Sequence, residues 1–200
     1  MINVPQAVIL ASASQVRARL LQGARVPFTV QASHVDEDQI KAELAGAGAD
    51  AIAARLAEAK ARAIAAGHKN ALIIGADQIL ECEGRLFDKP KDRAAAATHL
   101  RDLRGRSHRL VTAAAVVLGS DLLWQTVAET RLAMRNVSDQ FIDAYLDSVG
   151  DDALASVGAY RLEDMGAQLF SKIDGDYFTI LGLPLLELLE FLRGQGILVR

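Results

Sequence analysis

The chain has 200 residues, of which 51% are hydrophobic and 24% charged, a composition typical of a globular protein with one sizeable domain. Its formal net charge of -3 argues against a general nucleic-acid-binding protein, which would need a basic face. The single cysteine, Cys82, excludes an intrachain disulfide and fits a reducing compartment. No segment has the pattern of a signal peptide or a membrane span, so we expect a cytoplasmic protein with no membrane partner.

Short apolar runs alternate with longer amphipathic runs, a pattern that predicts an α/β fold. Neither a repeat nor a clear linker interrupts it, so we expect a single domain over residues 1–200. The predicted elements are, in chain order, a strand at 8–11, a helix from Ser14 to Gly23, a strand before residue 31, helices within 35–67 broken near Gly46 and Gly48, a strand at 71–80, a hairpin arm at 82–87, a helix within 91–105, two antiparallel strands within 108–135, a helix after Ser138, a strand at 167–173 and a helix from Pro184.

The first predicted strand runs directly into a segment that contains Ser12, Ser14 and Arg17. The first turn of a helix offers unpaired N–H groups and a positive dipole end, so this junction suits an anion such as a phosphate. Ser14 also suits a helix N-cap, which needs no ligand. Local sequence leaves both interpretations open.

Asp77 follows the apolar run 72–76 and is predicted to lie at the end of a buried strand. Ligands of open α/β sheets bind beyond the carboxyl ends of strands, although a strand-end aspartate also commonly caps a turn. Gly75 removes a side chain nearby and allows another backbone or a ligand to approach. Together, the Ser12–Arg17 junction and Asp77 indicate an enzyme that acts on phosphates with the help of a metal.

Other polar residues carry weaker signals. Lys89 precedes Pro90 and is predicted to be extended, projecting into a cleft or into solvent. His108 and Thr112 lie on one face of a predicted strand, either as site residues or on the outward face of an edge strand. Glu81 and Glu83 flank Cys82 and should raise the pKa of its thiol, which argues against a nucleophile. The scattered histidines give no zinc motif, so any metal would be a hard cation with oxygen ligands.

Familiar nucleotide and hydrolase motifs are absent: the sequence has no Walker A loop, no dinucleotide fingerprint and no nucleophile elbow. A different set of motifs occurs in order along nearly the whole chain. These motifs are LASASQVRARLL at 10–21, VDE at 35–37, AEAKA at 57–61, GADQIL at 75–80, FDKP at 87–90, LRGRSHRLVT at 103–112, SDQFIDAYL at 138–146 and GAYRLEDMGAQLFSKIDGDYFTILGLPLLELLEFL at 158–192.

In this order the motifs resemble the Maf (septum-formation inhibitor) family of nucleotide pyrophosphatases. The resemblance implies a mixed, twisted β-sheet flanked by helices, with two lobes around a nucleotide cleft, as in Maf and ITPase-like folds. It implies hydrolysis of a nucleoside triphosphate to the monophosphate and pyrophosphate with a divalent cation, Mg²⁺ or Mn²⁺. A homodimer is one assembly that it suggests.

The resemblance also implies roles for individual residues. Asp77 would be the general base, Glu37 the second catalytic carboxylate, and both would hold the metal. The substrate would be bound by Ser12, Ser14, Arg17, Lys60, Lys89 and Glu163. Several positions depart from the family pattern: Gln15-Val16 replaces Pro-Arg, Gln78 follows Asp77 where the family has threonine, and Ser156 stands where the family often has lysine.

Glu163 stands where the family has glutamine. An ionised carboxylate only accepts hydrogen bonds, which suits the N1–H and N2–H₂ groups of guanine better than the carbonyls of uracil or thymine. We therefore expect a preference for GTP-like or N7-methyl-GTP substrates. The alternatives are a dTTP/UTP-directed or broad specificity, a hydrolase of another phosphorylated metabolite, and a weakly active nucleotide-binding regulator of cell division.

Overall fold

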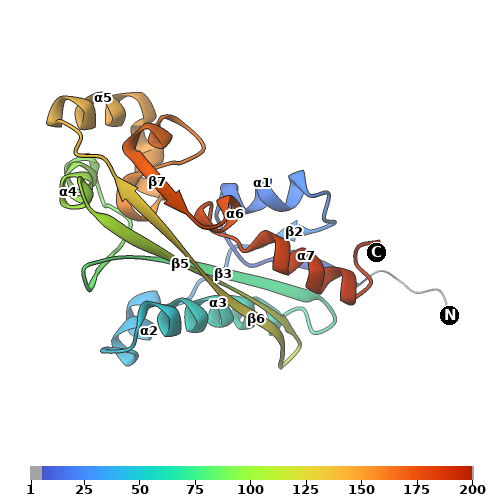
Figure 1. Cartoon of the computed structure of the whole chain (residues 1–200). Coiled ribbons are helices and arrows are strands. Elements are labelled where there is room, and N and C mark those ends of the chain that lie inside the picture. The colour runs from blue at the N-terminus through green and yellow to red at the C-terminus, as the bar shows by residue number, and fades with distance from the viewer. Residues whose placement is uncertain (1–5, 200) are drawn as a thin grey trace. The chain divides into compact units, whose positions relative to one another are not determined.

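The computed structural model describes residues 6–199 and contains a seven-stranded mixed sheet with helices packed on it (Figure 1). The strands follow the order β2-β1-β3-β5-β6-β7, with β4 paired to β3. Their bounds are β1 Val8–Leu10, β2 Thr29–Val30, β3 Leu72–Cys82, β4 Arg85–Phe87, β5 Ser107–Leu118, β6 Asp121–Met134 and β7 Phe170–Asp174. The predicted α/β class is confirmed.

Helices occupy most of the intervals between the strands. The α-helices are α1 Gln15–Gly23, α2 Glu37–Glu43, α3 Ala49–Ala65, α4 Arg93–Leu103, α5 Asp139–Val149, α6 Tyr177–Ile180 and α7 Leu185–Gly194. Three short 3₁₀ helices lie at Gly150–Ala155, Val157–Ala159 and Met165–Leu169. Within residues 6–199, none of the helices combines the length and the hydrophobicity that crossing a membrane requires.

The sheet mixes parallel and antiparallel pairs. The short strand β1 pairs in parallel with β2 and with β3, where Val8 lies opposite Leu72 and Leu10 opposite Ile74. The predicted hairpin is confirmed, since β3 and β4 pair antiparallel with Leu80 opposite Phe87. The pairing of β6 with β7 is also antiparallel.

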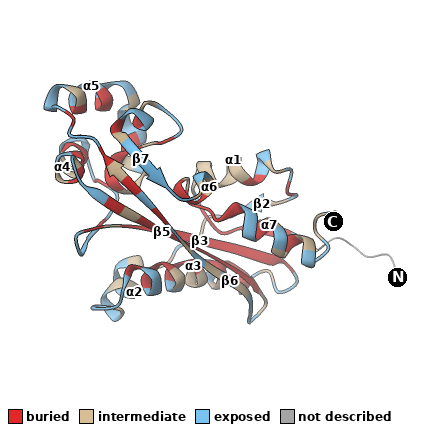
Figure 2. Cartoon of the chain, viewed as in Figure 1, coloured by how far each residue is buried: buried red, intermediate tan, exposed pale blue. Residues whose placement is uncertain are grey.

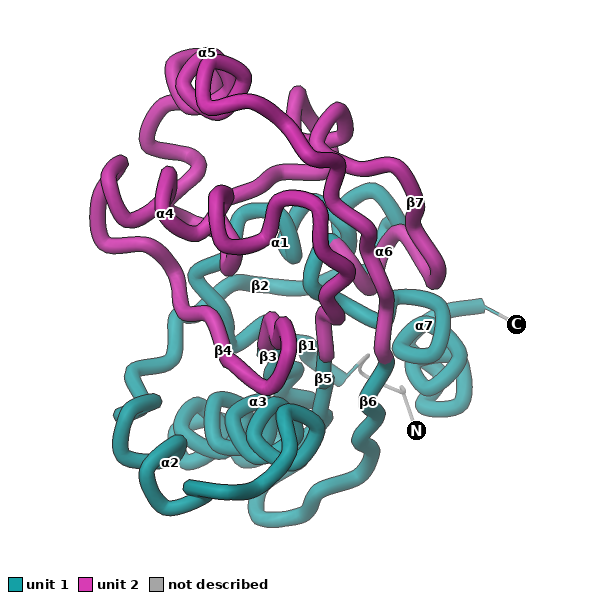
Figure 3. Tube along the Cα trace, turned by 60° about the vertical axis from the view of Figure 1, so that its left-hand side comes forward, with its two compact units in different colours: residues 1–77, 112–128, 181–200 teal, residues 78–111, 129–180 magenta. Residues whose placement is uncertain are grey.

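Two compact units share the chain (Figure 3). Unit 1 comprises residues 1–77, 112–128 and 181–200, and unit 2 comprises residues 78–111 and 129–180. Within β3 the chain therefore passes from unit 1 to unit 2 between Asp77 and Gln78. It returns to unit 1 for the last time between Ile180 and Leu181.

In unit 1, helices cover both faces of the sheet. Adjacent residues of a strand point to opposite faces, and two neighbours in β6 show what lies on each. The Trp124 ring stacks on Phe191 of α7, with centroids 5.5 Å apart, whereas Gln125 donates to the carbonyl of Ala54 in α3 over 2.9 Å. It follows that α7 and α3 lie on opposite faces.

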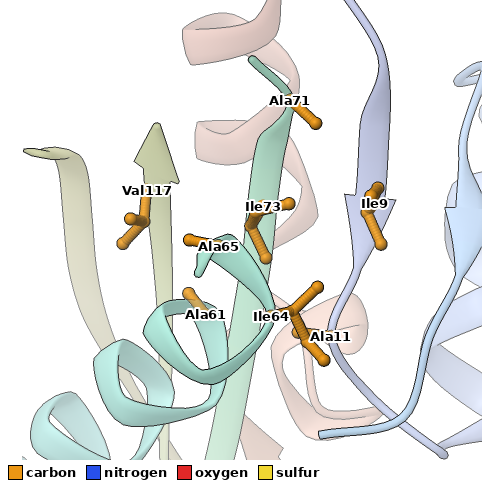
Figure 4. Close-up of a cluster of buried hydrophobic side chains, with 8 residues drawn as sticks. All are labelled: Ile9, Ala11, Ala61, Ile64, Ala65, Ala71, Ile73 and Val117. Carbon is orange, nitrogen blue, oxygen red and sulfur yellow. The ribbon is translucent and has the colours of Figure 1, made fainter. Parts of the chain in front are cut away.

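The core beneath α3 joins Ala61, Ile64 and Ala65 of the helix to a set of apolar side chains in and beside the strands, namely Ile9, Ala11, Ala71, Ile73 and Val117 (Figure 4). Ala61 and Ala65 are fully or almost fully buried, as is Ile73 of β3. Most of β3 is coloured as buried in Figure 2, as expected for a central strand of a sheet. Alanine lets a helix approach a sheet closely, so this surface determines how near the polar residues of α3 come to β3.

Unit 2 holds its 157–163 segment through buried polar groups. The Tyr145 hydroxyl of α5 donates to the carbonyl of Ala159 and accepts from the N–H of Arg161, over 3.2 and 3.1 Å. Tyr145 is fully buried, and burial raises the pKa of its phenol to about 12. Since this hydroxyl binds the backbone on both sides of Tyr160, it positions the turn that carries Glu163.

Candidate active site

The junction between β1 and α1 is built from local hydrogen bonds. Ser14 is the N-cap of α1, and its Oγ accepts from the N–H of Arg17 over 3.3 Å, as the sequence predicts. The buried Ser12 accepts from the N–H of Ser14 over 3.2 Å. Both predicted serines thus shape the first turn of α1, where backbone N–H groups and the helix dipole favour an anion.

Arg17 links this junction by hydrogen bonds to two segments of unit 1 that are distant in the sequence. Its Nε donates to the carbonyl of Gly182 over 2.7 Å, and its Nη1 donates to the carbonyl of Ala76 over 2.8 Å and to Ser12 Oγ over 3.3 Å. Burial lowers the pKa of the guanidinium, while the charges of Asp77 and Glu37 oppose that shift. The structure therefore places a fixed cation near both predicted carboxylates.

Lys60 of α3 joins the two carboxylates directly. Its Nζ lies 2.5 Å from Oδ1 of Asp77 and 2.8 Å from Oε1 of Glu37. The side chains of Lys60 and Asp77 are 12% and 9% exposed, whereas that of Glu37 is 44% exposed. The three residues form a charged cluster in which the ammonium of Lys60 lies between the two carboxylates. Because Glu37 is the most exposed member, an incoming phosphate can reach the cluster from its side.

The close approach of α3 to β3 depends on Gly75. A Cβ on this residue would lie 2.1 Å from the carbonyl oxygen of Ala57 and 2.8 Å from the nitrogen of Ala61. No side chain fits there, so glycine lets the helix backbone rest on the strand. The predicted close approach is confirmed, and the approaching group is the backbone on both sides of Lys60.

The prediction that Asp77 ends a strand is wrong. Asp77 lies in the middle of β3, which continues to Cys82 because its second half finds a new antiparallel partner in β4. The parallel pairing of β3 with β1, however, ends at Ile74. Asp77 therefore does lie just beyond the carboxyl end of a parallel pair, where α/β sheets bind ligands.

The remaining predicted residues, Lys89 and Glu163, belong to unit 2. Lys89 is exposed in the connection between β4 and α4. Glu163 accepts from Nε of Arg161 over 3.2 Å, and Arg161 also pairs with Asp152. Burial lowers the pKa of the Arg161 guanidinium, but Glu163 and Asp152 together outweigh this effect and raise the pKa above its usual value. Sequence analysis missed Arg161, although its position two residues before Glu163 could have indicated the pair.

His108 and Thr112 do not lie on an edge strand, because β5 runs between β3 and β6. His108 is 4% exposed, and its Nε2 lies 2.8 Å from the hydroxyl of Tyr160. Burial lowers the pKa of this histidine to about 4. His108 is thus a neutral core residue of unit 2, and Thr112 is a buried residue of unit 1.

Cys82 behaves as the sequence predicts. The thiol is buried in unit 2, and its pKa is raised by that burial, with Glu83 and Glu81 adding to the shift. A thiol with a raised pKa is largely protonated at neutral pH and is a poor nucleophile.

The donor set of the cluster suits a hard divalent cation. Glu37 and Asp77 supply carboxylate oxygens that share one ammonium partner. Residues 6–199 contain no group of three or more histidine, cysteine, aspartate or glutamate side chains that could enclose a metal by themselves. Mg²⁺ usually binds through one or two carboxylates together with water and substrate phosphates, so two carboxylates are sufficient protein ligands for it.

Comparison with known proteins identifies relatives over nearly the full length. The model of a family described as "Maf-like protein" matches residues 7–195. A nucleoside triphosphate pyrophosphatase from Paramagnetospirillum magneticum is 47% identical over 193 residues, covering 96% of this chain and 100% of the relative. A 7-methyl-GTP pyrophosphatase from Rhizobium johnstonii is 46% identical over 191 residues, covering 94% of this chain and 96% of the relative.

Proposed function

The chain belongs to the Maf-like protein family, and we propose that it is a hydrolase that converts a nucleoside triphosphate to the monophosphate and pyrophosphate. The names of its relatives support this reaction. The observation that carries the proposal is the placement of Lys60 between Glu37 and Asp77, close to Arg17 and the first turn of α1. Acid and base groups beside an anion-binding turn are the parts that phosphate hydrolysis requires.

In the proposed reaction a water attacks the α-phosphorus, and the bond from that phosphorus to the oxygen bridging the α- and β-phosphates breaks. The shielded carboxylate of Asp77 accepts the proton of the attacking water, and pyrophosphate leaves with the bridging oxygen. Lys60 has three N–H donors, two of which point to Glu37 and Asp77. The third donor can contact a phosphate oxygen and offset the charge that develops on it.

Arg17 contributes mainly by its position. Its guanidinium is already fixed by two backbone carbonyls and Ser12, so substrate binding needs little further ordering of this side chain. The N–H groups at the start of α1, which Ser12 and Ser14 arrange, complete the binding site for the triphosphate. The resemblance of the FDKP motif at 87–90 to the family supports a phosphate-binding role for Lys89.

Glu37 and Asp77 would hold a divalent cation, Mg²⁺ or Mn²⁺. When bound, the cation lowers the pKa of water and offsets the charge of the pyrophosphate leaving group.

Glu163 is proposed to select the base. Arg161 donates to Oε1 of this carboxylate, which leaves the other oxygen as an acceptor for the base. An accepting carboxylate suits guanine, and its negative charge also suits the positive charge of N7-methylguanine. The 7-methyl-GTP pyrophosphatase among the relatives supports this preference over dTTP, UTP or a broad specificity.

Pyrophosphate release by the wild-type protein and by Asp77→Asn tests the proposal. The substrates are GTP, N7-methyl-GTP, ATP, CTP, dTTP and UTP, each with Mg²⁺, with Mn²⁺ and with EDTA. We expect turnover that requires the cation and falls about 10³-fold in Asp77→Asn, the size of a general-base effect. Asp121→Asn, an exposed change at the start of β6, is the matched control and should retain activity.

Other outcomes would separate the alternatives. Nucleotide binding without turnover would favour a regulatory nucleotide binder, for which Gln15-Val16 in place of Pro-Arg is the supporting sequence feature. Turnover of other phosphorylated metabolites, but not of nucleoside triphosphates, would contradict the proposed substrate class.

A further inference from the structure

Gln78 follows Asp77 on β3, and its side chain points to the opposite face of the strand. Asp77 meets Lys60 of α3 on one side. On the other side Nε2 of Gln78 donates to the carbonyls of Thr179 and Ile180, over 3.0 and 3.1 Å. The amide has two N–H groups, one for each carbonyl, and the reversed orientation would set its oxygen against two carbonyl oxygens.

The segment that Gln78 binds is itself well fixed. Thr179 and Ile180 are the last residues of α6, where helix carbonyls lack partners within the helix. Both are buried, and the Asp176 carboxylate accepts from the N–H and the hydroxyl of Thr179, over 2.7 and 2.9 Å. Gln78 therefore supplies donors to two carbonyls at the end of α6, and these contacts hold its own side chain in place.

Arg17 donates to the same two segments, two residues before Gln78 on β3 and two residues after Ile180. It binds the carbonyl of Ala76, just before Asp77, and the carbonyl of Gly182, just after the carbonyls that Gln78 binds. The backbone of Asp77 is consequently anchored on both sides, by Arg17 at residue 76 and by Gln78 at residue 78. These are also the places where the chain passes between the two units.

We infer that Gln78 is a positioning residue for the hydrolysis: it holds the β3 backbone so that the Asp77 carboxylate faces the attacking water. This inference rests on the proposed function. Because Gln78 acts on Asp77 and not on the phosphates, its loss should lower kcat and leave KM unchanged. A displacement of about 1 Å at a catalytic group can cost up to about 100-fold in rate.

Gln78→Met tests this role, because methionine is similar in length and lacks the two donors. We expect kcat for the preferred nucleotide to fall about tenfold, with KM within about twofold of the wild-type value. Gln78→Glu keeps the shape but sets a carboxylate against two carbonyls, and it should lose at least as much. Rates are expressed per nucleotide-binding site, counted by calorimetric titration, so unfolded protein does not contribute.

Gln125→Met is the matched control, because Gln125 also donates its side-chain amide to a backbone carbonyl, that of Ala54. It should keep the wild-type kcat. An unchanged kcat per site in both Gln78 variants, or a loss confined to Tm or to the number of sites, would overturn the positioning role. Absence of turnover in the wild-type protein would instead overturn the proposed function, and the role of Gln78 with it.

Discussion

Nζ of Lys60 lies 2.5 Å from Oδ1 of Asp77, with both side chains largely shielded from water. Removing one partner of such a pair leaves the other charge poorly solvated, which typically costs about 3 kcal/mol. The same ammonium reaches Glu37 over 2.8 Å, so a single cation organises both predicted carboxylates. This pair is the most direct link between the stability of unit 1 and its proposed chemistry.

Lys60→Met should therefore lower both the free energy of unfolding and activity. We expect a loss of about 3 kcal/mol in urea denaturation and a fall in kcat/KM of at least about 100-fold. Arg62→Met, which removes a more exposed ion pair with Glu58 on the same helix, should cost under about 1 kcal/mol. A double variant Lys60→Met/Asp77→Asn should recover part of the lost stability, and strict additivity would contradict direct coupling.

Gly75→Ala should disturb the same pair without changing any charge. The added Cβ would meet the backbone of Ala57 and Ala61, so α3 must move away from β3. We expect a loss of about 2–3 kcal/mol in the free energy of unfolding, together with a marked fall in kcat. Gly23→Ala is the matched control: it has open space around its Cβ position and should leave both quantities nearly unchanged. If Gly75→Ala were as stable as the wild-type protein, the close contact between α3 and β3 would not require glycine at position 75.

His108 should make stability depend on pH. Its pKa is about 4 in the folded protein against 6.5 ordinarily, so between these values the unfolded chain binds a proton that the folded chain does not. This contribution to stability is complete above about pH 6.5 and is lost as the pH falls toward 4, up to about 3 kcal/mol.

Urea denaturation of the wild-type protein and of His108→Gln at pH 7.5, 6, 5 and 4 measures this contribution. The wild-type protein should lose more stability with falling pH than His108→Gln, since glutamine does not titrate. His34→Gln alters an exposed histidine and should follow the wild-type slope. Equal slopes in all three proteins would mean that His108 does not control the acid sensitivity.

Glu163→Gln should change the choice of base. Glutamine both donates and accepts, so it can pair with uracil or thymine, and it removes the negative charge that favours N7-methylguanine. We expect the ratio of kcat/KM for N7-methyl-GTP to that for dTTP to fall by about 10-fold or more. Glu190→Gln on α7 is the control for charge. An unchanged ratio would mean that Glu163 does not contact the base.

Sequence patterns predicted the secondary structure well where the signal is local. Ser14 and Ser138 cap their helices as expected, because an N-cap side chain binds a backbone N–H only a few residues away. The strand predicted at 71–80 is β3, which runs from Leu72 to Cys82, but the interior position of Asp77 was not predicted, because the second half of β3 is stabilised by pairing with β4. The short helix α6 was missed, since four residues give too little periodicity to detect.

The candidate site likewise has features that local sequence predicts and features that depend on contacts between distant residues. Local patterns were sufficient to predict the α/β class and the cap at the first turn of α1, and the order of the motifs supplied the residues of the proposed site. The partners of these residues are visible only in the folded chain: Lys60 with Asp77 and Glu37, Arg17 with Gly182, and Gln78 with the end of α6. Local patterns reflect neighbours within a turn or a pleat, whereas these contacts join residues that are far apart in the sequence and come together only in the folded chain.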